Sequence, residues 1–112
     1  MTKELEMRIA NKYPKLCADY LNEDAETCFY SFEFGDGWFD LIDSTLAEVN
    51  ELCEKSDFEV KIYQAKSKFS ELRLYFSIAP NQKGVRIQQA IAQLDSIVEK
   101  AIANSKLIKE NI

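Results

Sequence analysis

The feature that most constrains the fold of this chain is a change in the spacing of its apolar residues near residue 58. In residues 38–55, "WFDLIDSTLAEVNELCEK", apolar side chains recur every three or four positions, whereas in 58–66 and 72–79 they alternate with polar ones. A helix repeats every 3.6 residues and a strand every two. The sequence therefore predicts a helix over 38–55, followed by an antiparallel hairpin whose short connection is "SKFSE".

The rest of the chain adds helices and, at most, one more strand. Residues 2–22 have helical spacing, and Pro14 should break them, with the proline in the first turn of a second short helix. The aromatic run 28–34 is compatible with a short third strand. A final helix over 85–109 would span roughly 37 Å, so its end either projects from the core or pairs with a second copy as a homodimer. We expect a single α+β domain over 1–112, with a small antiparallel sheet packed against helices.

The stretch "GDGW", residues 35–38, holds two of the three glycines and the only tryptophan. Gly35 and Gly37 permit backbone angles that other residues resist, Asp36 can cap the following helix, and Trp38 can then enter the core. The alternative is that Asp36 and Trp38 border a ligand pocket together with Arg73.

Several chemistries are excluded by composition. Histidine is absent, which removes Ser-His-Asp and Cys-His catalysis. The three cysteines form no CxxC pair, and there is no glycine-rich phosphate loop. We therefore expect no enzymatic activity, no cofactor and no metal. The chain has no apolar segment typical of a secretory signal or a membrane span, so we expect a cytoplasmic protein.

Charge is distributed unevenly along the chain. Residues 19–59 carry thirteen acidic residues and one basic residue, a net of −12, and the remainder carries six acidic and thirteen basic residues, a net of +7. An acidic segment disfavours nucleic acid and suits a basic partner surface, unless folding interleaves the two parts and cancels the asymmetry. Much of the negative charge forms a stripe on the predicted helix, made of Asp40, Asp43, Glu48, Glu51 and Glu54. This stripe is either a partner-binding surface or a solvated helix face.

Two sets of residues on the predicted hairpin are further candidates. Lys66, Lys68 and Phe69 lie near its tip, where an exposed Phe between lysines could anchor a partner or could fold back onto the core. Lys61, Tyr63, Arg73 and Tyr75 share its outward face. Basic and aromatic side chains together suit a nucleic-acid-binding module, and a solvated sheet face is the alternative.

Two separated motifs, "FGDGWFDLID" and "QAKSKFSELRLYF", resemble those of a group of short uncharacterised proteins encoded by phages and prophages. The family pattern is approximately GDGW followed by QVKxKFGxLRxY. This chain departs from it at Ala65, at Ser70, where the family has Gly, and in lacking the Cys-x-x-Cys element of many members. The resemblance implies a mobile-element origin. With the acidic stripe and the hairpin tip, it leads us to expect an accessory protein that binds a host protein or complex, for example as an inhibitor of host defence or nucleic-acid processing.

Overall fold

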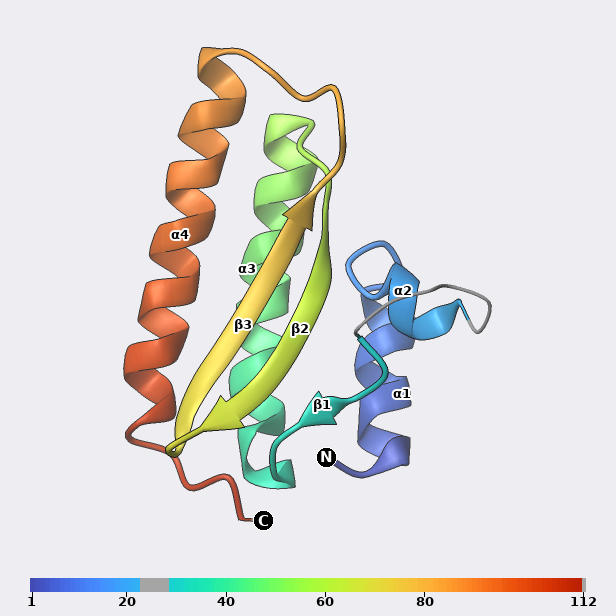
Figure 1. Ribbon diagram of the computed structural model, residues 1–112, viewed down its shortest axis with the longest axis vertical. Helices are drawn as coiled ribbons and strands as arrows, with labels where there is room; N and C mark the ends of the chain where they lie inside the picture. The colour runs from blue at the N-terminus through green and yellow to red at the C-terminus, as the bar shows by residue number, and fades with distance from the viewer. Residues whose placement is uncertain (23–28, 112) are drawn as a thin grey trace.

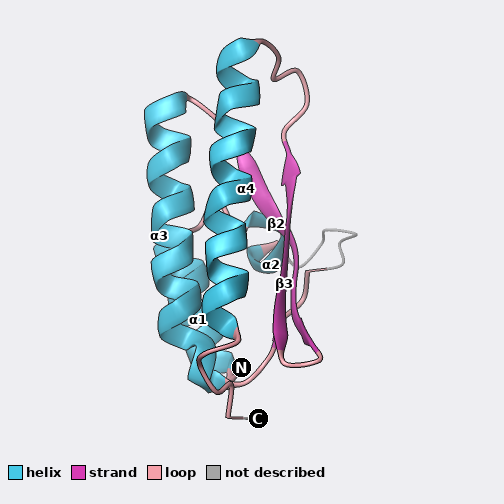
Figure 2. Cartoon of the chain, turned by 90° about the vertical axis from the view of Figure 1, so that its left-hand side faces the viewer, coloured by secondary structure: helices cyan, strands magenta, loops and turns pink. Residues whose placement is uncertain are grey.

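Two long helices lie on one face of a small three-stranded sheet in the computed structural model, which describes residues 1–22 and 29–111 (Figures 1 and 2). The helices are α3 (Phe39–Ser56), preceded by the 3-10 turn η1 (Asp36–Trp38), and α4 (Val85–Ser105). The strands are β1 (Phe32–Glu33), β2 (Val60–Lys68) and β3 (Glu71–Ile78). The predicted α+β class, the helix near 38–55 and the hairpin are therefore confirmed.

The sheet is mixed rather than wholly antiparallel. Its strand order is β1-β2-β3, and β2 and β3 form the predicted antiparallel hairpin. The third strand is only two residues long and pairs with β2 in parallel, placing Phe32 opposite Ala65. Residue 28, where this strand was expected to begin, lies outside the described residues. The parallel direction follows from the chain path, because α3 carries the chain back before β2 begins (Figure 1).

A β-bulge at Tyr63 interrupts the hairpin. Ile62 pairs with Phe76 and Gln64 pairs with Tyr75, which are adjacent in β3. Tyr63 is therefore an extra residue in β2, between two consecutive pairs of the register. An extra residue shifts the alternation of the bulged strand by one position. For this reason the buried positions of β2 change from even numbers, such as Ile62, to Ala65.

The N-terminal region breaks near Pro14 as predicted, into α1 (Lys3–Lys12) and α2 (Ala18–Leu21). Pro14 lies in the turn before α2 rather than in its first helical turn. This region is held to the remainder by Ile62, whose N–H donates to the Leu16 carbonyl at 2.8 Å. The Tyr13 hydroxyl also donates to Asp43 in α3, at 2.8 Å from Oδ1.

The last helix ends at Ser105, four residues before the predicted end. Ser105 is buried, and its hydroxyl donates to the Ile102 carbonyl at 2.6 Å and accepts the Leu72 N–H at 3.1 Å. A serine bonded to the preceding turn competes with helical backbone bonding. Residues 106–111 then leave the helix direction and run back along the base of the molecule (Figure 1). The expectation that the helix continues to 109 is therefore wrong.

The core lies between the helices and the sheet. Its largest fully buried side chains include Trp38, Phe29, Phe32 and Phe58. Trp38 has no exposed surface and its ring lies 5.3 Å from that of Phe34, within the range of favourable aromatic pairs. The prediction that Trp38 enters the core is confirmed.

Candidate functional site

The "GDGW" turn is occupied by the chain's own C-terminal tail, residues 106–111. The Gly37 N–H donates to the Glu110 carbonyl at 2.6 Å, and the Trp38 indole N–H donates to the Ile108 carbonyl at 2.7 Å. The Glu110 carboxylate is buried, where it accepts the Gly35 N–H at 3.3 Å and the Ser67 hydroxyl at 2.6 Å. These bonds tie the tail to both the turn and β2.

The tail explains why this turn needs glycines. A Cβ on Gly35 would lie 2.1 Å from the Glu110 carbonyl oxygen, and one on Gly37 would lie 2.0 Å from that of Lys109. Neither glycine has a positive φ, so the requirement is the space for a second backbone rather than an unusual conformation.

Asp36 does not cap α3, contrary to the sequence expectation. Its carboxylate instead accepts the Thr2 N–H at 2.7 Å, and no side-chain hydrogen bond caps η1 or α3. Nor does Asp36 share a pocket with Arg73, because the cavity that Arg73 lines is formed by β3 and α4. The turn therefore fastens the N-terminal residues and the C-terminal tail, and neither Asp36 nor Trp38 lines the cavity that contains Arg73.

The acidic stripe on α3 is partly paired within the protein. Asp43 forms an ion pair with Lys12 at 3.0 Å, Glu51 pairs with Lys55 at 2.7 Å, and Glu48 pairs with Lys100. Asn50 donates to Glu54 at 3.4 Å, and Asp40 is exposed. Folding thus brings basic residues from other parts of the sequence to the stripe. The stripe therefore has less unpaired negative charge than the sequence alone indicates.

The outward face of the hairpin carries Lys61, Tyr63, Arg73 and Tyr75, all of them at least partly exposed. Both of its cations have acidic neighbours. Lys61 lies 2.9 Å from Asp19, and Arg73 lies 3.7 Å from Glu71. These pairs compete with phosphate for the cations, so the geometry gives a nucleic-acid surface little support.

The hairpin tip places Phe69 almost entirely in solvent. Lys68 and Glu71 are paired, so Phe69 and Ser70 form a two-residue turn, and their φ angles of 55° and 60° identify it as type I′. The side chain of Phe69 is 90% exposed and does not fold back onto the core. The Lys68 ammonium lies 5.8 Å from its ring centre, which keeps a cation beside the aromatic face.

The C-terminal tail adds apolar surface beside this tip, which sequence reasoning missed. Leu107 is 83% exposed and Ile108 is 40% exposed, and both line a depression that also includes Ser70. Lys106 and Lys109 flank them, with Lys106 lying 3.4 Å from Glu71. The sequence "KLIK" at 106–109 falls within the helix predicted over 85–109, and that prediction gives no sign of its exposure. We call this surface the tip patch: Lys68, Phe69, Lys106, Leu107, Ile108 and Lys109.

The two described cysteines are poorly suited to nucleophilic chemistry. Burial raises the pKa of Cys17 to about 12, and burial also raises the pKa of Cys53. The thiolate is the reactive form, so neither sulfur is activated at neutral pH. Cys28 lies outside the described residues. Within residues 1–22 and 29–111, no group of three metal-ligating side chains comes together, and no helix has the length and apolar character needed to cross a membrane.

Comparisons of this chain with protein-family models, with curated proteins and with solved structures find no match.

Proposed function

We propose that this chain is a protein-binding accessory protein whose tip patch contacts a partner with an apolar pocket bordered by carboxylates. The observation that carries the proposal is the exposure of Phe69 in a turn that does not suit it. Type I′ turns favour Asn and Gly, because both central residues have positive φ. A bulky side chain at positive φ costs stability, and strain of this kind is concentrated at functional sites.

The surroundings of Phe69 support the same function. Aromatic residues that project from a rigid scaffold are frequent binding anchors. Leu107 widens the apolar area, and the tip patch also carries Lys68, Lys106 and Lys109, which would favour an acidic partner and speed association. The acidic stripe on α3 stays a second candidate contact for a basic partner, but its intramolecular ion pairs make it the weaker one.

The resemblance to phage and prophage proteins supports a host-cell macromolecule as the partner. We extend the proposal to inhibition of a host defence or nucleic-acid-processing complex. The tip patch itself supports only the binding step.

The test uses a matched pair of substitutions. Phe69→Asn removes the apolar anchor and suits the positive φ, so it should retain the fold. Val85→Asn removes a side chain of similar exposure, 70%, at the first residue of α4. The start of α4 lies at the opposite end of the molecule from the hairpin turn (Figure 1). Host-cell extract is passed over the immobilised original chain and over each immobilised variant. Any captured protein is then purified, and its affinity is measured for the original chain, Phe69→Asn and Val85→Asn.

We expect one host protein to bind the original chain and Val85→Asn, and to lose affinity for Phe69→Asn by about tenfold or more. The affinity should also fall as salt is added, because lysines contribute. If Phe69→Asn retains every captured protein, the tip patch is not the binding site. A gel shift with nucleic acid at low salt would instead support the hairpin face.

A further inference from the structure

One edge of the sheet, that of β3, has no neighbouring strand within the described residues. β3 is the last strand in the order β1-β2-β3, and the tight turn makes Lys68 and Glu71 a hydrogen-bonded pair. In antiparallel pairing the residues of one strand alternate between bonding the partner and pointing away from it. Leu72, Leu74, Phe76 and Ile78 therefore direct their backbone groups away from β2. The bond from the Leu72 N–H to Ser105 agrees with this assignment, and it caps only the first of these positions.

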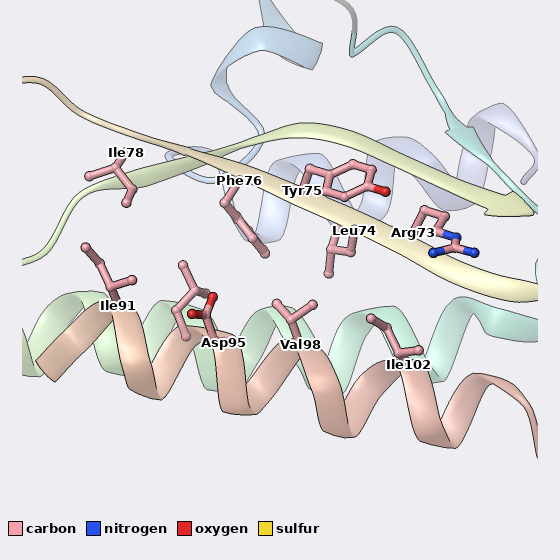
Figure 3. Close-up of a pocket in the computed structure, with 10 residues that line it drawn as sticks. Arg73, Leu74, Tyr75, Phe76, Ile78, Ile91, Asp95, Val98 and Ile102 are labelled. Carbon is pink, nitrogen blue, oxygen red and sulfur yellow. The ribbon is translucent and has the colours of Figure 1, made fainter. Parts of the chain in front are cut away.

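A groove of about 320 Å³ lies beside this edge, between β3 and α4 (Figure 3). Its lining is mostly apolar and includes Phe76, Ile78, Ile91, Val98 and Ile102. Ile78 is 41% exposed although it belongs to the inward face of β3. Natural sheet edges are commonly protected by lysine, proline or a covering element. β3 has a single basic residue, Arg73, and no proline, so the edge is suited to pairing with another strand.

The charges in the groove indicate that the strand that pairs with β3 is the β3 of a second copy. Arg73 and Asp95 both line the groove, and they lie on opposite sides of Tyr75 along its length (Figure 3). The Nε of Arg73 is buried and has no hydrogen-bond partner within the described residues, while its Nη1 lies 3.7 Å from Glu71. A second copy related by a two-fold axis through Tyr75 would bring its Asp95 to the level of Arg73 in the first copy. By the same symmetry, its Arg73 would lie at the level of Asp95 in the first copy. The groove is therefore complementary to itself in charge.

We propose that β3 and its groove bind the same surface of a second copy of this chain, antiparallel, with Tyr75 on the two-fold axis. Tyr75 then faces its symmetry mate in a non-hydrogen-bonded pair, where aromatic side chains interact favourably. Leu74 pairs with Phe76 of the partner copy, so the inward apolar side chains meet over the two α4 helices. The result is a continuous six-stranded sheet and an isologous dimer. This surface is separate from the tip patch, so either proposal can fail without the other.

Charge exchange tests the contact. Sedimentation of the original chain should show a dimer that dissociates on dilution. Asp95→Arg and Arg73→Glu should each raise the dissociation constant by about tenfold or more, because they place like charges together. The double variant should restore dimerisation. Glu99→Arg is the control, since it makes the same charge change at an exposed position of α4 outside the groove. A monomer at every concentration, or equal effects of Asp95→Arg and Glu99→Arg, would overturn the proposal.

Crosslinking tests the register. Cα atoms in a non-hydrogen-bonded pair are about 4.5 Å apart, within the range that a disulfide spans. In a Cys28→Ser, Cys53→Ser background, Tyr75→Cys should therefore form a covalent dimer on mild oxidation. Ser77→Cys should not, because its symmetry mate would be about four residues, or roughly 13 Å, away. Crosslinking through Ser77→Cys, or through neither position, would refute the two-fold axis at Tyr75.

Discussion

Among single residues, Asp43 joins the N-terminal region to α3 through hydrogen bonds. Its carboxylate accepts hydrogen bonds from Lys12 at 3.0 Å and from the Tyr13 hydroxyl at 2.8 Å. Partial burial alone would raise the pKa of Asp43, but these bonds outweigh burial and lower the pKa below its usual value of 3.8. A carboxyl group with a lowered pKa in the folded state stabilises the fold above its unfolded pKa, and this contribution is lost as the pH falls through the folded pKa.

We predict that Asp43→Asn lowers the free energy of unfolding by about 1–2 kcal/mol at neutral pH, because charge-assisted bonds are lost. The difference from the original chain should begin to shrink below pH 3.8, the usual pKa of the carboxyl group, and should continue to shrink as the pH falls through the lower pKa of the folded state. Denaturant titrations at neutral and acid pH measure both values. Glu51→Gln, which alters an exposed pair within α3, should have almost no effect. A difference that is equally large at acid pH would contradict the assignment.

Gly37 is the second residue whose role can be measured by itself. We predict that Gly37→Ala destabilises the protein by about 2 kcal/mol, because its Cβ would overlap the Lys109 carbonyl, at 2.0 Å. The same substitution in a chain that ends at Lys106 should cost much less, since the overlapping backbone is gone. Additive effects in this double-mutant cycle would show that the glycine is not required by the tail.

At the scale of elements, the β2–β3 hairpin has a well-defined strand register, but its turn contains residues that do not favour a positive φ. Ser70 has a φ of 60°, a conformation that glycine adopts without penalty. We predict that Ser70→Gly raises the free energy of unfolding by about 0.5–1 kcal/mol. Ser77→Gly in β3 should instead lower it, because glycine weakens a strand interior. Thermal unfolding of the two variants compares them directly.

Element types were predictable wherever the apolar period was long. The α3 stripe and the two alternating segments define their structures locally, and the structure confirms all three. The two-residue β1 could not be assigned in length or direction, since it depends on pairing with Ala65 far along the chain. The end of α4 depends in the same way on the bond between Ser105 and Leu72.

The candidate site was only half predictable for a related reason. The short hairpin connection predicts Phe69 and Lys68, whereas Lys66, predicted with them, is half-buried within β2 and is not part of the tip patch. Leu107 lies in a segment whose apolar spacing predicts a helix. Its exposure results from the tail turning back to the glycines, and no local pattern encodes that contact. Two ion pairs of the acidic stripe are also long-range, Asp43 with Lys12 and Glu48 with Lys100, whereas Glu51 pairs locally with Lys55.

For the whole molecule, the tail closes the base of the fold over Trp38. We predict that removing residues 107–112 lowers the free energy of unfolding by about 2–4 kcal/mol, the sum of several lost hydrogen bonds. Because Trp38 is the only tryptophan, its fluorescence should shift to longer wavelength as water reaches the indole. Leu107→Ser in the full chain is the control. It should change neither property, since that side chain is 83% exposed. An unshifted spectrum after truncation would mean that the tail does not cover the ring.

The turn at Phe69 and Ser70 has a consequence for how the sequence would respond to selection. In a library randomised at these two positions and sorted for protease resistance alone, Asn-Gly should come to dominate. If the same library is sorted for capture by a cognate target, an aromatic side chain should return at the first position despite its penalty. The residues enriched in the first pool would show what this turn requires for folding, and those enriched in the second would show what it requires for binding.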